Sequence, residues 1–281
     1  MPPISYRAPM TGTQILRVGI AGYGSIGQLV VAHLDRGIEG LRLAAVAGRD
    51  VDKTRHQLET LQNPVEAVPV AELAELCDVV VDCAPPEQFG SVVTRPIERG
   101  RTVITVSATS LIDNEHLIAK AKETGARIVL VSGSLVGFDG IRAAACGTIH
   151  SASLTTRKPP LSLDGNPWIV KHGIDVRSIR EATRIFSGTA REAARAFPDK
   201  FNVAATLALA SIGPDKVDVH IWLDPAVERN VHQIKIDADS TSFEAEIRNL
   251  PNPGHKGTGP FTAFHVLAAL RDLVSTMRVG T

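Results

Sequence analysis

The order of apolar and polar positions divides the chain into two halves. In the first half, short apolar runs of strand length alternate with segments of helical period, from Ile15 to about Gly133. Apolar strands separated by helices are typical of a parallel, doubly wound sheet. The pattern therefore predicts an α/β fold whose first domain, residues 13–132, is a Rossmann domain.

The second half has a different texture. Residues 147–163 and 215–251 alternate apolar and polar positions, and the latter segment holds several such runs without a helix between them. This pattern predicts a second α+β domain over residues 133–259 with a largely antiparallel sheet. Residues 260–281 contain a last helical segment, which we expect to pack back on the Rossmann domain.

A glycine motif follows the first predicted strand directly. Gly22, Gly24 and Gly27 form G-x-G-x-x-G, with Ser25 and Ile26 at the start of the next helical segment. The first glycine permits a tight turn, the second lets a pyrophosphate approach the backbone, and the third lets helix and strand pack closely. Free N–H groups at the helix start attract an anion. These five residues are predicted to bind a dinucleotide.

The end of the second predicted strand bears on the choice between NAD and NADP. A Rossmann domain usually places an acidic residue there, about 20 residues past the glycines, to bind the adenosine ribose. Here Gly48 and Arg49 occupy the position, and Asp50 comes late. Glycine leaves room for a 2′-phosphate and arginine can bind it, although Arg49 can equally be a solvent-facing loop residue. The pattern favours NADP at least as strongly as NAD.

Composition narrows the class of protein. The chain has 281 residues, 44% hydrophobic and 21% charged, with zero formal net charge. No basic block suggests nucleic acid, no stretch is long and apolar enough for a membrane span, and residues 1–14 do not resemble a signal peptide. Cys77, Cys83 and Cys146 form no C-x-x-C pair, so we expect free thiols, no metal site and a cytoplasmic protein. Cys83 is expected to be buried rather than nucleophilic.

Three segments resemble one family. The sequences SGSLVGFDGIRAA (132–144), FPDKFNVAATLALASIG (197–213) and DPAVERNVHQIKI (224–236) are similar to those of L-aspartate dehydrogenases, over nearly the whole chain. The resemblance implies NAD(P)-dependent oxidation of L-aspartate to iminosuccinate, which hydrolyses to oxaloacetate and ammonia, or the reverse reaction. It also implies that His232 is the active-site residue, that Asn202 contacts the nicotinamide end, and that the chain forms a homodimer through its second domain.

The chemistry of amine oxidation independently suits His232. Removing hydride from an amine carbon requires a base to take a proton from the ammonium group, and an activated water must then attack the iminium. Histidine has an ordinary pKa that suits both tasks near neutral pH. The other reading of a single histidine is a surface or satisfied core residue.

The chain departs from the family in two places. Ser134 stands where the family usually has an alanine at the cofactor, and we expect its hydroxyl to reach the cofactor. The segment 252–259, NPGHKGTG, replaces the family's Asn-Pro-Lys-Thr-Ser. Lys256 is the expected substrate contact from this glycine-rich loop, with Thr258 beside it and His255 as the alternative. The loop is expected to close over a bound carboxylate.

Arg157 and Lys158 form an adjacent pair of cations that also resembles the family. Together they can neutralise a small dicarboxylic substrate, or they can mark a solvated strand end. Two other functions stay open at this point. One is a related oxidoreductase for another small carboxylate, such as a hydroxy acid or aldehyde, and the other is a non-catalytic NADPH-binding module.

Overall fold

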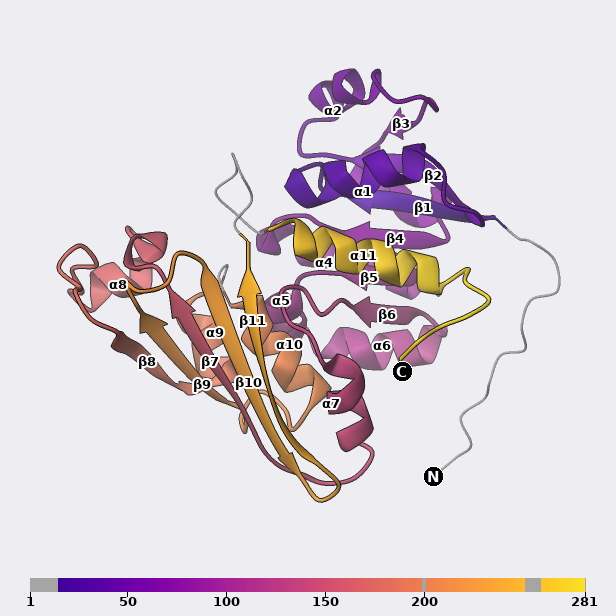
Figure 1. Cartoon of the computed structure of the whole chain (residues 1–281). Helices are drawn as coiled ribbons and strands as arrows, with labels where there is room; N and C mark the ends of the chain where they lie inside the picture. Colours follow the sequence, from indigo (N-terminus) through magenta and orange to yellow (C-terminus); the bar gives the residue numbers. More distant parts are fainter. Residues whose placement is uncertain (1–14, 199–200, 251–258, 281) are drawn as a thin grey trace.

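The computed structural model describes residues 15–198, 201–250 and 259–280, which form two sheets in neighbouring domains (Figure 1). Sheet A is parallel and six-stranded, with the order β3-β2-β1-β4-β5-β6. Its strands are β1 (Leu16–Ala21), β2 (Leu41–Ala47), β3 (Glu66–Ala67), β4 (Val79–Asp82), β5 (Thr102–Thr105) and β6 (Arg127–Leu130). The strand order reverses direction between β1 and β4, so the predicted doubly wound fold is confirmed.

Helices cover both faces of sheet A because its strands are apolar on both sides. In β4, Val79 and Val81 pack in one core cluster and Val80 packs in another, as alternating strand residues must. The first cluster contains α1 (Ser25–Asp35) and α11 (Pro260–Asp272). The second contains residues of α3 (Leu73–Leu76), α4 (Phe89–Glu98) and α6 (His116–Thr124). Helix α2 (Val51–Leu58) follows β2.

Sheet B has five strands in the order β11-β10-β7-β9-β8. Its strands are β7 (Ile149–Lys158), β8 (Thr183–Thr189), β9 (Asp218–Leu223), β10 (Asn230–Ala238) and β11 (Ser242–Asn249). The pairs β10–β11, β10–β7 and β8–β9 are antiparallel, whereas β7 and β9 run parallel. The sheet is therefore largely antiparallel, as predicted, with one parallel pair that the sequence pattern did not reveal.

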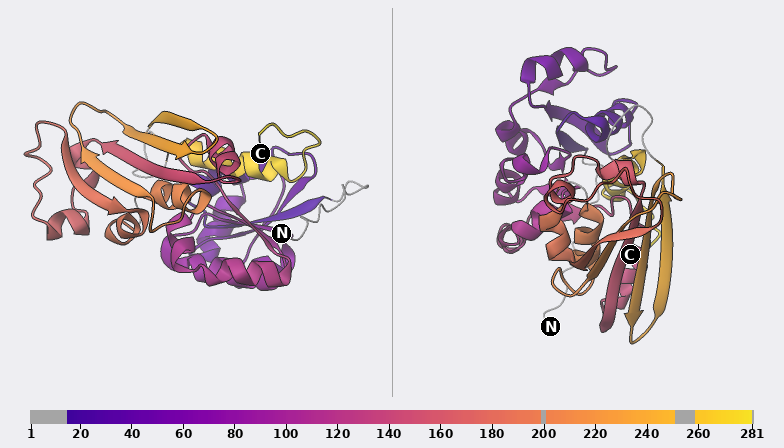
Figure 2. Two further views of the ribbon diagram at one scale, coloured as in Figure 1. Left: turned by 90° about the horizontal axis from the view of Figure 1, so that it is seen from below. Right: turned by 90° about the vertical axis from the view of Figure 1, so that its left-hand side faces the viewer.

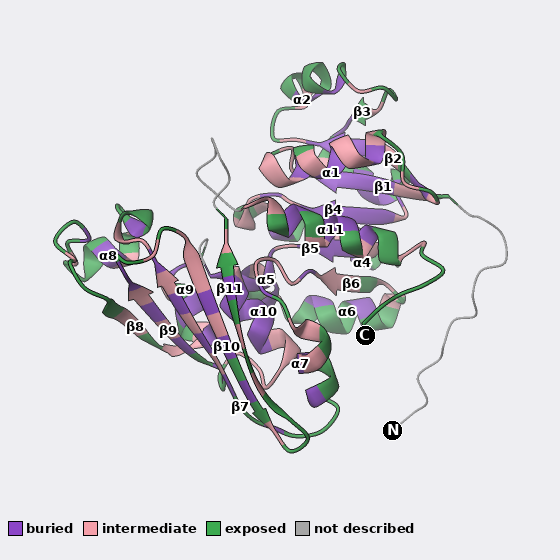
Figure 3. Cartoon of the chain, viewed as in Figure 1, coloured by how far each residue is buried: buried purple, intermediate pink, exposed green. Residues whose placement is uncertain are grey.

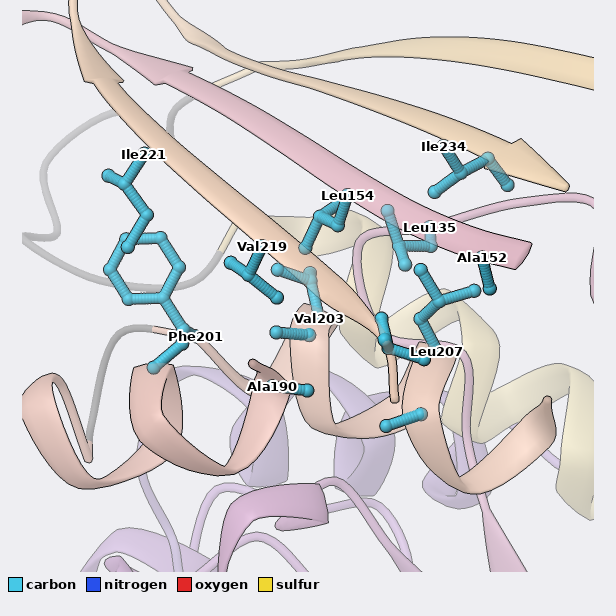
Figure 4. Close-up of a cluster of buried hydrophobic side chains, with 14 of the residues drawn as sticks. Leu135, Ala152, Leu154, Ala190, Phe201, Val203, Leu207, Val219, Ile221 and Ile234 are labelled. Carbon is cyan, nitrogen blue, oxygen red and sulfur yellow. The ribbon is translucent and has the colours of Figure 1, made fainter. Parts of the chain in front are cut away.

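One face of sheet B packs on helices α9 (Ala190–Ala196) and α10 (Asn202–Ala210), as the labelled side chains in Figure 4 show. These helices lie on the side of sheet B that faces sheet A (Figure 2). Two shorter helices, α7 (Phe138–Ala144) and α8 (Pro167–Lys171), complete this domain. Buried residues concentrate along the strands and on the inner helix faces (Figure 3).

The two domains meet where α10 packs on α5 (Ala108–Asp113). Ala108 and Ile112 of α5 form a buried cluster with Ala205 of α10. Small side chains let the two helix backbones approach, so this junction fixes the position of α10 relative to the ends of β4 and β5. Among the described residues, no helix has both the length and the apolar character needed to cross a membrane.

Candidate active site

The glycine motif forms a cradle of bare backbone at the end of β1. Gly22 has φ +95°, and a Cβ there would lie 2.5 Å from the Cys83 carbonyl oxygen. A Cβ on Gly27 would overlap the Gly22 carbonyl oxygen, so helix and turn are in direct contact. Gly24 differs because nothing lies within 4 Å of its Cβ position. The open space over Gly24 fits the close approach of a dinucleotide pyrophosphate.

The start of α1 offers hydrogen-bond donors to that space. Gly24 is the N-cap residue and supplies no side-chain cap, and Ser25 and Ile26 form the first turn with Gly27. The first N–H groups of a helix have no intrahelical acceptor, and the helix dipole favours an anion there. The turn also lies between β1 and β4, where the strand order reverses, which is the place where open α/β sheets bind nucleotides. The predicted cofactor site is therefore geometrically suited to its ligand.

At the end of β2, Gly48 and Asp50 have structural roles that do not depend on the cofactor. A Cβ on Gly48 would overlap the hydroxyl of Thr54, so this glycine serves the packing of α2 whatever the cofactor. Asp50 caps α2, because its carboxylate accepts a hydrogen bond from the Lys53 N–H at 3.0 Å. Arg49 is exposed. Of the residues at the expected ribose position, Arg49 is thus the one whose side chain is left for a 2′-phosphate.

His232 lies in the buried face of sheet B. It is 3% exposed and pairs with Thr156 of β7 and Ile247 of β11 across the two neighbouring strands. A hydrogen bond of 3.0 Å joins its Nδ1 to the Thr156 hydroxyl. Burial and the charge of Lys158 lower the pKa of His232 to about 3. The imidazole is therefore neutral near neutral pH and can accept a proton.

Lys158 is a buried cation close enough to His232 to act on its charge. Residues 156 and 158 share one face of β7, so Lys158 points to the same side as Thr156. It is 6% exposed, and its ammonium lies 5.1 Å from the centre of the Phe201 ring. A buried ammonium next to a neutral histidine disfavours further positive charge and favours a carboxylate.

Arg157 emerges on the opposite face of β7. Its guanidinium donates to Asp224 at 3.2 Å and stacks over Trp222 at 5.3 Å. Adjacent strand residues point to opposite sides of a sheet. Arg157 and Lys158 therefore point to opposite faces of β7, and of the two it is Lys158 that shares the face of Thr156 and His232.

Asn202 begins α10 at the junction of the two domains. Its Oδ1 accepts hydrogen bonds from the backbone N–H and the hydroxyl of Thr109, at 3.1 and 2.9 Å. Ser134 is tied to the sheet B side of the junction, because its carbonyl oxygen accepts from the Asn249 side chain at 3.0 Å. Asn202 thus lies where α10 meets α5, and Ser134 lies next to the end of β11.

Three predicted substrate residues, His255, Lys256 and Thr258, lie outside the described residues, as do residues 1–14. Desolvation raises the pKa of the Cys83 thiol, which disfavours the reactive thiolate. Across the described ranges, no group of three or more His, Cys, Asp and Glu side chains is placed to bind a metal.

Three further residues support the site. Thr156 holds the histidine ring, Thr109 holds Asn202, and Asp82 is a fully buried carboxylate at the end of β4. Burial raises the pKa of Asp82, while hydrogen bonds from Thr105 and the Ala84 N–H oppose that shift. Of these three residues, only Thr156 is indicated by the sequence. It stands two positions before Lys158, so the two side chains share one face of the strand.

The fold and the site together define a nicotinamide-dependent dehydrogenase, with a dinucleotide cradle at the end of β1 and a buried histidine in sheet B. Comparison with known proteins identifies the family within this class of enzymes. Residues 139–273 match the family model "Aspartate dehydrogenase, C-terminal", and residues 22–131 match "Homoserine dehydrogenase, NAD binding domain". The chain is 46% identical over 271 residues to L-aspartate dehydrogenase of Bradyrhizobium diazoefficiens, covering 96% of each protein.

Other relatives agree. L-Aspartate dehydrogenase 3 of Bordetella bronchiseptica is 38% identical, with 97% of this chain and 100% of that protein covered. The crystal structure of Thermotoga maritima aspartate dehydrogenase superposes with a TM-score of 0.73 at 25% identity, covering 94% and 99% of the two chains. The chain belongs to the L-aspartate dehydrogenase family.

Proposed function

We propose that the chain catalyses the NAD(P)-dependent oxidative deamination of L-aspartate to iminosuccinate, which hydrolyses to oxaloacetate and ammonia, or the reverse reductive amination. The names of its relatives support this reaction. The observation that carries it is the buried pair of a neutral His232 and a cationic Lys158 on one face of sheet B. This pair offers a base for an ammonium group beside a cation for a carboxylate.

His232 is suited to move the protons of the reaction. When Nδ1–H donates to Thr156, Nε2 keeps its lone pair and accepts a proton from the substrate ammonium group. An oxidised NAD(P) cofactor with its pyrophosphate at the glycine cradle would supply the hydride acceptor. Once that proton has passed to solvent, Nε2 of His232 can accept a proton from the water that attacks the iminium carbon.

Lys158 explains how such a weakly basic histidine works as a base. Without substrate, burial and the charge of Lys158 together lower the pKa of His232 and keep the ring neutral. A bound dicarboxylate supplies negative charge next to both groups, which offsets the charge of Lys158 and raises the pKa of His232. The base therefore becomes stronger at the time when the substrate is in place.

Three further properties belong to this proposal. Arg49 at the end of β2 supports NADP at least as strongly as NAD. A homodimer through sheet B follows from the family resemblance, and solution mass would test it. A cytoplasmic location agrees with the free cysteines at 77, 83 and 146.

A substrate screen tests the reaction. The purified enzyme is given oxaloacetate and ammonium with NADH or NADPH, and L-aspartate with the oxidised cofactors. We expect cofactor oxidation that requires both oxaloacetate and ammonium. Reduction of a keto acid without dependence on ammonium would instead indicate a hydroxy-acid dehydrogenase, and cofactor binding without turnover of any substrate would indicate a binding module.

A further inference from the structure

The amide of Asn202 is held in one orientation by Thr109. Both partners on its Oδ1 are donors, the backbone N–H and the hydroxyl of Thr109. An amide nitrogen cannot accept these bonds, so only the oxygen satisfies the pair. The two contacts therefore determine which side of the amide faces Thr109 and which side faces away from it.

The opposite side of the amide carries the N–H donors. In the described part of the chain, no hydrogen bond involves Nδ2 of Asn202, whereas Oδ1 has two. Asn202 is the first residue of α10 and follows Phe201, whose ring contacts the ammonium of Lys158. Asn202 therefore adjoins, in sequence, a residue that contacts Lys158, at the point where the two domains meet.

Thr109 is itself rigidly placed. It is 5% exposed and lies in the first turn of α5, which follows β5 directly. The Ser107 N–H donates to the Thr105 hydroxyl at 2.9 Å, and that hydroxyl donates to Asp82 at 2.7 Å. This chain of hydrogen bonds anchors the start of α5 to the ends of β4 and β5, beside the glycine cradle.

We propose that Thr109 is a positioning residue for the cofactor: its two donors hold Oδ1 of Asn202, so that the Asn202 N–H donors are presented to the nicotinamide carboxamide. The inference rests on the proposed function and on the contact between Asn202 and the nicotinamide end that the family resemblance implies. Thr109 reaches the cofactor through Asn202 and makes no contact with substrate in this scheme. Thr109 belongs to the Rossmann domain, and Asn202, the residue proposed to contact the nicotinamide, belongs to the other domain.

Binding of two ligands separates this role from a general structural one. NADH is compared with ADP-ribose, which lacks the nicotinamide, and NADPH with 2′-phospho-ADP-ribose, by isothermal titration calorimetry. Thr109→Val removes the hydroxyl and keeps the backbone donor. Loss of one hydrogen bond predicts a roughly 5- to 10-fold weaker affinity for the reduced cofactor, with less than about a 2-fold change for the ligand without nicotinamide.

Three other variants sharpen the test. Thr109→Ser keeps the hydroxyl and should restore affinity, whereas Asn202→Asp still accepts from Thr109 but offers no N–H donor and should lose at least as much affinity as Thr109→Val. Thr124→Val is the matched control, because it removes a hydroxyl that donates to the Ile97 carbonyl oxygen at 2.6 Å, elsewhere in the Rossmann domain. Thermal unfolding midpoints show whether each variant is folded.

Two results would overturn the inference. One is equal weakening of both ligands by Thr109→Val, which means that the residue only maintains the domain junction. The other is unchanged affinity for the reduced cofactor in both Thr109→Val and Asn202→Asp. If the wild-type enzyme binds cofactor and fails to turn over aspartate, the proposed function is wrong. The ligand comparison tests the role of Thr109 separately, because it does not depend on turnover.

Discussion

The cofactor edge of sheet A and the His232 site of sheet B are built on opposite principles. The first is six consecutive residues of backbone, and its key feature is the absence of a side chain at Gly24. The second is made of side chains from separate strands, with Thr156 and Lys158 on β7 and His232 on β10. Local sequence specifies the first, whereas strand register specifies the second.

The two regions also differ in how they treat charge. The start of α1 offers uncharged N–H groups to an anion and needs no buried ion. The His232 site instead keeps a buried lysine beside a histidine that burial and the lysine charge hold neutral. A change at the cofactor edge should therefore appear in cofactor affinity, and a change at the His232 site should appear in turnover or in the Michaelis constant for substrate.

The largest expected effect comes from removing the base. His232→Ala should lower turnover by roughly a hundredfold or more, since general acid–base groups contribute about that much. Cofactor affinity should stay within about twofold, because His232 lies on sheet B and takes no part in the glycine cradle. Steady-state kinetics and cofactor titration measure the two quantities separately.

A second histidine provides the control for that experiment. His220 of β9 bonds to the Ser187 hydroxyl at 3.0 Å and is only partly buried, whereas the buried face of its strand carries Val219 and Ile221. His220→Ala should leave turnover nearly unchanged. Unchanged turnover in His232→Ala would show that this residue takes no part in the mechanism. It would also show that turnover does not depend on the His232 site as the comparison of the two regions requires.

The next effect distinguishes the two adjacent cations of β7. Lys158→Met keeps much of the side-chain volume and removes the ammonium, so the Michaelis constant for aspartate should rise roughly 10- to 50-fold, as expected for loss of a charged contact. Arg157→Met should raise it less than about threefold, because Arg157 is engaged with Asp224 on the other face. Equal effects of the two substitutions would show that both cations reach the substrate.

Much of the fold could be predicted from the sequence because each signal is local. Apolar runs of strand length and the glycine motif each lie within a short segment, and they led correctly to a Rossmann domain. The parallel pairing of β7 with β9 could not be predicted, since β8, α9 and α10 come between them in the chain. Periodicity does not reveal which distant strands pair.

The site shows the same limit. The family resemblance identifies His232 as the expected active-site residue. The sequence around His232 does not predict that Thr156, 76 positions away, bonds to its ring. Thr109 and Asn202 lie 93 positions apart and meet only because α5 packs on α10. Gly48 was attributed to space for a phosphate, whereas the structure gives it a packing reason against Thr54.

The smallest expected effect concerns the cofactor edge and its choice of nucleotide. Arg49 is exposed, and Asp50 beside it is occupied in capping α2. If Arg49 binds a 2′-phosphate, its replacement by alanine removes a charged contact of about 1–2 kcal/mol at a solvated position. NADPH affinity should then fall about tenfold while NADH affinity changes less than about twofold.

Arg55→Ala, which removes an exposed arginine paired with Asp52 on α2, should affect neither cofactor. Equal weakening of NADH and NADPH by Arg49→Ala would assign Arg49 a structural role, because only a 2′-phosphate contact discriminates between two ligands that are otherwise the same.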